Sequence, residues 1–266
     1  MEDLARRVAA QDQWYHTLEL APGVVTPGWY DLRALPAQLP LPARLDGLRC
    51  LDVGTFDGFW AFELERRGAS EVMAVDLLDP LGWDWPAGSA PDTVEAIGQR
   101  KRGGAGFELA AAALGSAVRR EERSVYDLDP VQIGTFDLVY VGSLLLHLRD
   151  PVRAIERVRA VCAGSALFVD AIDLPLTRLA PGTPLAGLDG RGRPWWWLPN
   201  QAGLRRMIEA GGFALAQAPR QVRMAPGAGQ PRGRLRPAVL RTRVQRRALV
   251  AARRGEPHAA LLARPA

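Results

Sequence analysis

Residues 51–60, with the sequence LDVGTFDGFW, constrain the fold of this chain more than any other stretch. A short apolar run ends at Val53, a turn with glycines at positions 54 and 58 follows, and an amphipathic segment begins at once with Phe59. This order predicts a strand, a tight turn and a helix. Glycine lets the backbone come close to a ligand, and the N–H groups at the start of a helix favour a polar or anionic group.

Asp76, which lies 24 positions after Asp52, closes the next apolar run at residues 71–75. A carboxylate at the tip of a second strand can accept hydrogen bonds from a ribose. Phe56 occupies the middle position of the glycine pattern, where its side chain hinders the close backbone approach that a pyrophosphate requires. These residues favour S-adenosylmethionine (SAM), a nucleoside that carries an amino acid, over a dinucleotide. A purely structural turn is the alternative.

The composition is that of a globular chain, with 48% hydrophobic and 24% charged residues, and 266 residues suffice for one domain with elaborations. No apolar run approaches the length of a membrane span, and the first residues lack the apolar core of a signal peptide. The only cysteines, Cys50 and Cys162, lie in apolar runs and are expected to be core residues. We therefore expect a cytoplasmic protein with no membrane partner. The sequence does not specify its oligomeric state.

Positive charge is concentrated at residues 219–257, an insertion with 11 arginines and one glutamate. The whole chain has a formal charge of +5, so the remainder of the chain is net negative. The arginines of this insertion can neutralise the phosphates of RNA. Apolar residues recur at helical spacing over residues 240–252, so a solvated amphipathic helix is the alternative.

From residue 48 onward, segments that predict strands alternate with segments that predict helices. This alternation is typical of an α/β domain with a doubly wound parallel sheet. Asp150 and Asn200 are suitable caps for the last two helices. The expected strands are 48–53, 71–76, 118–123, 136–142, 165–171, 212–218 and 258–263, and the expected helices are 58–67, 92–99, 106–114, 150–162 and 200–210.

Residues 1–47 precede this core and are expected to form an N-terminal arm. A helix is expected within residues 2–13, and two Pro-Gly turns then frame aromatic and alternating apolar residues. The expected organisation is an arm or lid at 1–47 and a SAM-binding domain at 48–266, with the Arg-rich insertion placed before the last strand.

The cofactor contacts are expected just past the carboxyl ends of the first four strands, because open α/β sheets bind their ligands there. Asp127 can accept a hydrogen bond from an adenine amino group, although a simple turn before Asp129 explains it equally well. Trp83 and Trp85 follow the second strand, close to the expected adenine position, where packing is the commoner use. The full set of expected cofactor contacts is Asp52, Gly54, Thr55, Phe56, Asp57, Gly58, Asp76, Leu77, Tyr126, Asp127 and Gly142.

A family resemblance is carried by segments 14–17, 26–28, 51–60, 124–130, 136–139, 144–151, 197–200, 210–213 and 259–264. Together they resemble class I SAM-dependent methyltransferases, in particular the branch similar to tRNA wobble-uridine (5-methoxyuridine or 5-oxyacetate) methyltransferases. The resemblance covers roughly residues 14–218 and the last strand. It implies a Rossmann-like, seven-stranded α/β sheet with an antiparallel last strand, and SAM as the cofactor.

Two departures from that branch concern the cofactor. In members that transfer a carboxymethyl group, a lysine of the arm and a tyrosine before the histidine of the fourth-strand motif hold the extra carboxylate. This chain has His16 and Leu146 at those positions. A carboxylate without these partners is costly in a closed pocket, so ordinary SAM is expected. The chain is also shorter at its N-terminus than the bacterial tRNA enzymes.

Methyl transfer from a sulfonium is an in-line displacement in which the protein aligns the reactants and can remove a proton. The expected bases are His147, beyond the fourth strand, and His16, in the arm, with Asp170 as a third candidate. A structural hydrogen bond is the alternative for His147, and pairing with a loop N–H is the alternative for Asp170. Substrate contacts are expected from Trp14, Tyr15, His16, Arg149 and Trp196; the last belongs to a Trp-Trp-Trp run that can stack a flat acceptor or form a hydrophobic lid.

The function expected first is metal-independent transfer of methyl from SAM to an O or N nucleophile of a small molecule, because no spacing of His and Asp predicts a metal site. The first alternative is methylation of a tRNA wobble uridine. The second is a non-catalytic protein with a SAM-binding fold that binds RNA through its Arg-rich insertion.

Overall fold

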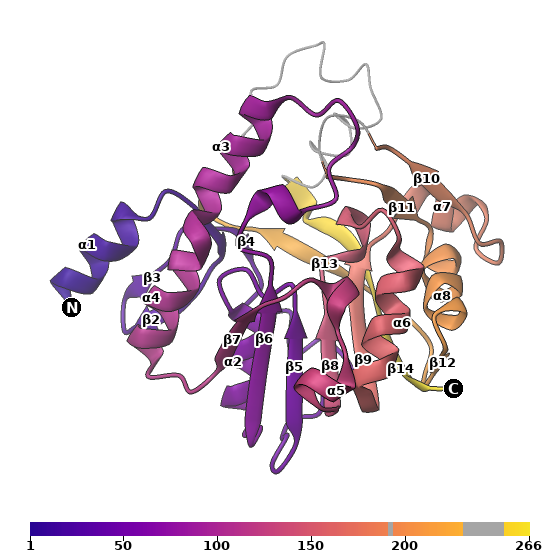
Figure 1. Cartoon of the computed structure of the whole chain (residues 1–266), viewed down its shortest axis with the longest axis horizontal. Coiled ribbons are helices and arrows are strands. Elements are labelled where there is room, and N and C mark those ends of the chain that lie inside the picture. Colours follow the sequence, from indigo (N-terminus) through magenta and orange to yellow (C-terminus); the bar gives the residue numbers. More distant parts are fainter. Residues whose placement is uncertain (191–193, 231–252) are drawn as a thin grey trace.

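The computed structural model describes residues 1–190, 194–230 and 253–266 (Figure 1). Its strands are β1 (Trp14–His16), β2 (Glu19–Ala21), β3 (Val24–Val25), β4 (Gly28–Asp31), β5 (Arg49–Val53), β6 (Glu71–Asp76), β7 (Arg119–Glu122), β8 (Phe136–Val141), β9 (Cys162–Ala171), β10 (Ala186–Leu188), β11 (Trp197–Pro199), β12 (Phe213–Leu215), β13 (Arg220–Pro226) and β14 (Glu256–Pro265). Its α-helices are α1 (Glu2–Ala10), α2 (Phe59–Arg66), α3 (Pro91–Lys101), α4 (Ala105–Leu114), α5 (Pro130–Ile133), α6 (Pro151–Val161), α7 (Leu174–Leu179) and α8 (Gln201–Ala210). Short 3₁₀ turns η1 (Pro80–Gly82), η2 (Arg102–Gly104), η3 (Val125–Asp127) and η4 (Leu145–His147) complete the described elements.

The central sheet follows the order β7-β6-β5-β8-β9-β14, with β5 paired in parallel to both β6 and β8. The last strand, β14, runs antiparallel to β9, with His258 opposite Ala171 and Ala263 opposite Ala166. The fold is therefore the predicted Rossmann-like α/β sheet, mainly parallel with an antiparallel last strand. Among the described residues the main sheet has ten strands, because the expected core of seven is extended at one edge.

Two apolar layers enclose this sheet, and alternate residues of each strand enter opposite layers. Cys50 of β5 packs in the layer that contains residues of α2 and α4. Leu51 and Val53 of the same strand pack in the layer that contains residues of α5, α6 and α8. The near-continuous apolar runs that predicted these strands are explained by burial on both faces.

Helix boundaries agree with the sequence where a cap is present. The Asp150 side chain accepts a hydrogen bond from the Arg153 N–H (3.0 Å) at the start of α6, and the Asn200 side chain accepts one from the Gly203 N–H (2.7 Å) at the start of α8. These contacts satisfy N–H groups that a helix cannot bond internally. Among the described residues, no helix has the length and apolar character needed to cross a membrane.

The expected strand at 212–218 and the expected insertion at 219–257 differ most from the structure. Within 212–218 the strand is limited to β12, and a further strand, β13, lies inside the segment assigned to the insertion. Both strands pair with β14. The expected amphipathic helix at 240–252 and most of the insertion's arginines lie outside the described residues.

The N-terminal arm joins the edge of the sheet. Ala225 and Pro226 of β13 pair with Asp31 and Tyr30 of β4, and β4 pairs in parallel with β1. A side-chain contact adds to this, because the Tyr30 hydroxyl donates to Glu256 Oε2 at the start of β14 (2.9 Å). The aromatic run and the two turns predicted an extended arm, and pairing with the sheet edge gives its backbone the partners that a free arm lacks.

Candidate active site

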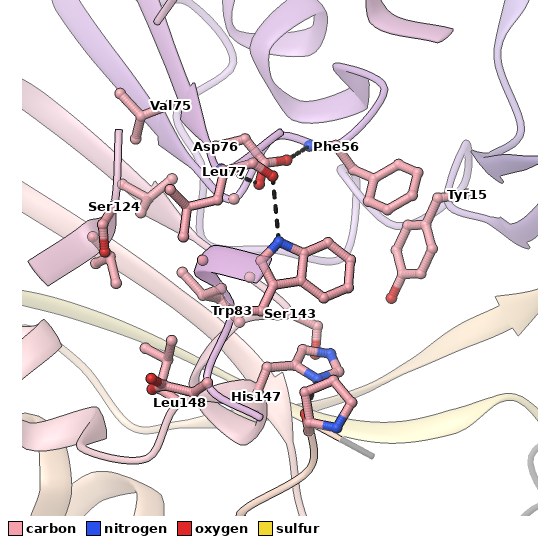
Figure 2. Close-up of a pocket in the computed structure, with 18 of the residues that line it drawn as sticks. Tyr15, Phe56, Val75, Asp76, Leu77, Trp83, Ser124, Ser143, His147 and Leu148 are labelled. Carbon is pink, nitrogen blue, oxygen red and sulfur yellow. Dashed lines mark hydrogen bonds between the residues drawn. The ribbon is translucent and has the colours of Figure 1, made fainter. Parts of the chain in front are cut away.

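A cavity of about 350 Å³ lies beyond the carboxyl ends of β5, β6 and β8, where open α/β sheets bind their ligands (Figure 2). The glycine loop that follows β5, residues 54–58, forms one wall, and the arm forms another. Other walls come from the loop after β6, from residues 123–126 after β7, and from residues 142–148 after β8. The cavity therefore gathers the segments that the sequence placed past the first four strands.

Asp76 holds the glycine loop in place. Its Oδ2 accepts a hydrogen bond from the Phe56 N–H (2.8 Å), and its Oδ1 accepts one from the Leu77 N–H (2.7 Å) (Figure 2). Phe56 adopts a φ of 50°, a left-handed conformation that is uncommon for a bulky residue. Because each carboxylate oxygen can accept more than one hydrogen bond, Asp76 can order this loop and still receive a ligand hydroxyl.

Gly58, at the start of α2, is required both by its φ of 94° and by the space around it. A Cβ at this position would lie 2.4 Å from Cε2 of Phe62. Gly47 has a similar φ of 74°, but a Cβ there would meet nothing within 4 Å. An alanine would therefore meet the same backbone penalty at both positions, but steric crowding only at position 58.

Substituting these glycines separates the two effects. Gly47→Ala is expected to lower the free energy of unfolding by about 1 kcal/mol, the cost of a left-handed alanine. Gly58→Ala is expected to lose about 1–3 kcal/mol more, because the ring of Phe62 must shift. Urea denaturation of both variants measures the difference, and equal losses would show that the loop relaxes around the added methyl group.

Tyr15 and Phe56 form an aromatic wall where the arm meets the glycine loop. Their ring centroids lie 5.0 Å apart (Figure 2). The ring centroids of Tyr30 and Trp29 of β4 lie 5.2 and 6.5 Å from that of Tyr15. Burial, together with the nearby carboxylates of Glu256, Asp170 and Asp57, raises the pKa of Tyr15 far above its usual range, so the hydroxyl stays protonated. Aromatic faces in a negative field suit a cation.

Asp57 ties the arm to the glycine loop. Its Oδ2 accepts hydrogen bonds from the N–H groups of Tyr15 (2.8 Å) and His16 (3.0 Å), and its Oδ1 pairs with Nδ1 of His16. Asp57 was predicted to contact the cofactor, but its oxygens are used on the arm. His16 lines the cavity and is only 4% exposed. An aspartate at Nδ1 fixes the orientation of the ring, so that Nε2 of the neutral imidazole is the atom able to take up a proton.

His147 enters the cavity from the loop after β8. Its Nδ1 lies 2.6 Å from the Pro194 carbonyl oxygen, which can only accept, so Nδ1 carries the proton and donates. The Trp195 ring lies edge-on at 6.4 Å, and Trp195 lines the cavity. A structural bond at the start of the helix was the alternative expected for His147, but the bond goes to the distant Pro194 and leaves the neutral ring in the tautomer that can accept a proton at Nε2.

Asp170 supports the loop after β8. Its Oδ2 accepts hydrogen bonds from the N–H groups of Leu144 (2.8 Å) and Leu145 (2.7 Å), and its Oδ1 accepts one from the Ala171 N–H (2.8 Å). The side chain is 2% exposed and does not border the cavity. Of the two interpretations of Asp170, pairing with loop N–H groups fits the structure, and a role as a base does not.

A polar cluster at the edge of the cavity holds Arg149 and Trp196, which do not border it, through Asp84 and Tyr126, which do. Asp84 Oδ2 accepts hydrogen bonds from the Tyr126 hydroxyl (2.7 Å) and the Arg149 N–H (2.7 Å), and the Asp84 carbonyl accepts from Trp196 Nε1 (2.6 Å). The Arg149 guanidinium lies 5.0 Å from the centre of the Trp196 ring. Burial and the bond to Asp84 raise the pKa of Tyr126 above its usual range. These bonds fix the wall formed by the loop after β6.

The predicted residues divide into those that border the cavity and those that do not. Trp14 lies in the core, where its Nε1 donates to the Val8 carbonyl oxygen (3.1 Å). Asp127 is exposed, and its neighbours Ser124 and Val125 border the cavity instead. The predicted residues that border the cavity are Tyr15, His16, Gly54, Phe56, Asp76, Leu77, Tyr126, Gly142 and His147. Those that do not are Trp14, Asp52, Thr55, Asp57, Gly58, Asp127, Arg149, Asp170 and Trp196.

Sequence reasoning missed several lining residues. Trp195 takes the place predicted for its neighbour Trp196, and Trp29 comes from the Thr-Pro-Gly turn of the arm. Ser143 follows directly after Gly142 and was passed over in favour of the histidine further on. The other missed lining residues are Gln13, Val53, Val75, Gly82, Asp84, Arg123, Ser124, Val125, Leu144, Leu148 and Pro194, while Trp83, placed by the sequence near the adenine position with packing as the commoner use, also borders the cavity. Among the described residues, no group of three or more His, Cys, Asp or Glu side chains is arranged to hold a metal ion.

Asp52 is buried at the end of β5, where its Oδ2 accepts a hydrogen bond from the Ala61 N–H (3.1 Å). Burial raises its pKa from 3.8 to about 7. The folded protein then binds a proton that the unfolded chain has lost, so stability should fall as the pH rises between these two values and stay level above them. Asp52→Asn is expected to remove this decline, a change of a few kcal/mol at about 1.4 kcal/mol per pKa unit. Urea denaturation across this pH range measures the free energy of unfolding of both proteins. If that free energy depends on pH in the same way in both, the raised pKa of Asp52 is contradicted.

Neither a protein-family model nor a curated protein matches the sequence. Solved structures do match. The N-terminal domain of EvdMO1, crystallised in the presence of S-adenosylhomocysteine (SAH) and D-fucose, has a TM-score of 0.57 and 16% identity over 100% of this chain and 97% of that domain.

A second match is the Burkholderia thailandensis 1,6-didemethyltoxoflavin-N1-methyltransferase with bound 1,6-didemethyltoxoflavin and SAH. It has a TM-score of 0.50 and 15% identity, and the match covers 83% of this chain and 72% of that one. At such identities the likeness concerns the fold. The chain has the Rossmann-like fold found in SAM-dependent methyltransferases.

Proposed function

We propose that this chain is a SAM-dependent methyltransferase that methylates an O or N nucleophile of a small molecule. The observation that carries the proposal is the cavity beyond β5, in which the glycine loop held by Asp76 faces His16 and His147. Two proteins of the same fold support it, since one was crystallised with SAH and D-fucose and the other with SAH and 1,6-didemethyltoxoflavin. Both of these second molecules are small.

The residues present suit SAM. The Asp76 carboxylate borders the cavity at the position from which a ribose is held in such folds. Ser124, Val125 and Tyr126 border the same cavity and offer a polar and apolar surface for the adenine. The aromatic wall and the surrounding carboxylates suit the positively charged sulfonium. Since His16 and Leu146 provide no dedicated cation for an extra carboxylate, ordinary SAM is proposed over its carboxylated form.

His16 is proposed as the base, with Asp57 as its partner. As the bond from the methyl carbon to sulfur breaks and the bond to the acceptor's O or N forms, the acceptor's proton passes to Nε2 of His16, and Asp57 stabilises the imidazolium. His147 is the second candidate, since its tautomer also leaves Nε2 able to accept a proton. The proposed chemistry uses no metal ion, because a histidine base suffices for this proton transfer.

The arm at 1–47 is proposed to act as a lid over the domain at 48–266. It contributes Gln13, Tyr15, His16 and Trp29 to the cavity wall. Its attachment through Asp57 links closure of the lid to the glycine loop that receives SAM. In this proposal the same contact that closes the site also brings in the base.

Transfer of labelled methyl from SAM to a panel of phenols, amines, hydroxy acids and bulk tRNA tests the function. Label is expected in a small molecule. His16→Gln should lower turnover by about 100-fold, the typical contribution of a general base, while its affinity for SAH stays within a few-fold. Label in tRNA alone would replace this proposal with the RNA alternative. Absence of transfer and of SAM binding, together with RNA binding that weakens steeply with salt, would favour the non-catalytic alternative.

A further inference from the structure

The third histidine of the chain, His258, stands behind the cavity wall. It lies on β14 and is 1% exposed. Its Nδ1 lies 3.0 Å from the Glu256 carbonyl oxygen, and its Nε2 lies 2.9 Å from the hydroxyl oxygen of Ser143. Ser143 borders the cavity, while His258 does not, so a buried imidazole is paired with a hydroxyl on the cavity wall. This pair belongs neither to the predicted cofactor contacts nor to the proposed bases.

The direction of these hydrogen bonds follows from the acceptor at one end. A backbone carbonyl can only accept, so Nδ1 of His258 carries the proton and donates to Glu256. In the neutral ring Nε2 is then an acceptor, and the hydrogen of the Ser143 hydroxyl points to it. With its hydrogen committed, the hydroxyl offers only lone pairs to the cavity. His258 thus makes Ser143 a dedicated hydrogen-bond acceptor.

Flat rings line the same cavity as this acceptor. Tyr15 and Trp29 come from the arm, Trp195 comes from the segment before β11, and His147 comes from the loop after β8. Figure 2 shows Ser143 and His147 on the far side of Trp83 from Asp76, the residue proposed to hold the ribose. Aromatic walls favour a planar ligand, which they contact by stacking or edge-on. A planar ring placed here can donate a hydrogen bond to the Ser143 oxygen, which accepts and does not donate.

We infer that Ser143 binds the methyl acceptor and selects a planar ring that carries an O–H or N–H donor. His258 is the positioning residue that fixes the direction of the Ser143 hydroxyl. This inference rests on the proposed function, and it narrows the acceptor to aromatic hydroxyls and ring or aryl amines.

Three small rings test the inference without the natural acceptor: phenol, aniline and anisole. Phenol and aniline carry a donor, and anisole is the methyl ether that matches phenol. Ligand-observed NMR on the SAH-loaded protein at about pH 8, where an imidazole is neutral, gives their dissociation constants. Phenol is expected to bind about three- to tenfold more tightly than anisole, which is the range of one net hydrogen bond. Comparison of aniline with phenol shows which donor is preferred.

The variants separate the roles of the two residues. Ser143→Ala should raise the dissociation constant of phenol until it equals that of anisole. His258→Phe frees the Ser143 hydroxyl to rotate and donate, so anisole should bind more tightly and the preference should vanish. His258→Gln is the conservative variant, because its amide oxygen can still accept from Ser143, and it should keep the preference. If His258 had only a structural role, its substitution would weaken the binding of all three rings by the same factor.

Several results would overturn the inference. They are equal binding of phenol and anisole by the unaltered protein, a preference that survives in Ser143→Ala, and absence of binding by all three rings. Titration of each protein with SAH is the separate control for the cofactor site. A protein that fails to bind SAM or SAH but prefers phenol in the Ser143-dependent manner would refute the proposed function and leave the ring site in place.

Discussion

Asp76→Ala is expected to lower the affinity for SAM by at least about 100-fold. The carboxylate is proposed to accept hydrogen bonds from the ribose, and hydrogen bonds to a charged group contribute about 1.5–3 kcal/mol each. The variant also leaves the Phe56 N–H without its acceptor, so the glycine loop loses the contact that holds its left-handed residue. Calorimetric titration with SAM and with SAH measures the loss, which should be similar for both ligands because they share the ribose.

A matched control is Asp79→Ala. Asp79 lies on the same loop, and its carboxylate accepts a hydrogen bond from the Leu81 N–H (2.8 Å) at the surface. It does not border the cavity, so its loss should change SAM affinity by less than about twofold. Unchanged SAM affinity in Asp76→Ala would refute the assignment of the ribose position. The other proposed cofactor contacts depend on that position and would be refuted with it.

Asp57→Ala is expected to lower the free energy of unfolding by about 3–5 kcal/mol. The substitution strips the acceptor from two backbone N–H groups and from the His16 ring, all at the buried junction of the arm and the glycine loop. Each buried donor left without a partner costs about 1–3 kcal/mol, and the large losses seen on single substitution arise from such networks. Urea denaturation of the purified variant measures the change.

Asp127→Ala is the control for this second prediction. Asp127 was an equal candidate for cofactor binding from the sequence, but it is exposed and its substitution should change stability by no more than about 0.5 kcal/mol. Asp57→Asn is informative as well, since its amide oxygen can still accept from the backbone N–H groups, and it should recover part of the loss. If Asp57→Ala proves as stable as Asp127→Ala, the arm is held by its strand pairing and not by this carboxylate.

The fold could be predicted because its signals are local. Strands β5, β6 and β8 are apolar runs buried on both faces. A glycine turn begins the helix after β5 and Asp150 caps the helix after β8, so neighbouring residues specify these elements. The edge of the sheet could not be predicted in the same way. The pairing of β13 with β4 joins residues almost 200 positions apart by only two residue pairs, and the segment's many arginines and prolines obscured the strand.

The residues of the candidate site also fall into two groups, those that could be predicted from the sequence and those that could not. Asp76, Gly54 and His147 lie where the strand ends bring them, so topology alone directs them to the cavity. Asp57 and Asp170 look identical to ligand-binding carboxylates in the sequence, and only the structure shows that backbone N–H groups occupy their oxygens. The pairing of Ser143 with His258 is set by the antiparallel last strand, and the two residues share no local pattern.

The most direct test of the account is calorimetric titration of the purified protein with SAM and then with SAH. Saturable binding of both ligands at about one per chain is expected, with micromolar affinity that Asp76→Ala abolishes and Asp79→Ala leaves intact. Absence of heat from either ligand, with the protein shown to be folded, would contradict the proposal that the cavity beyond β5 is a SAM site.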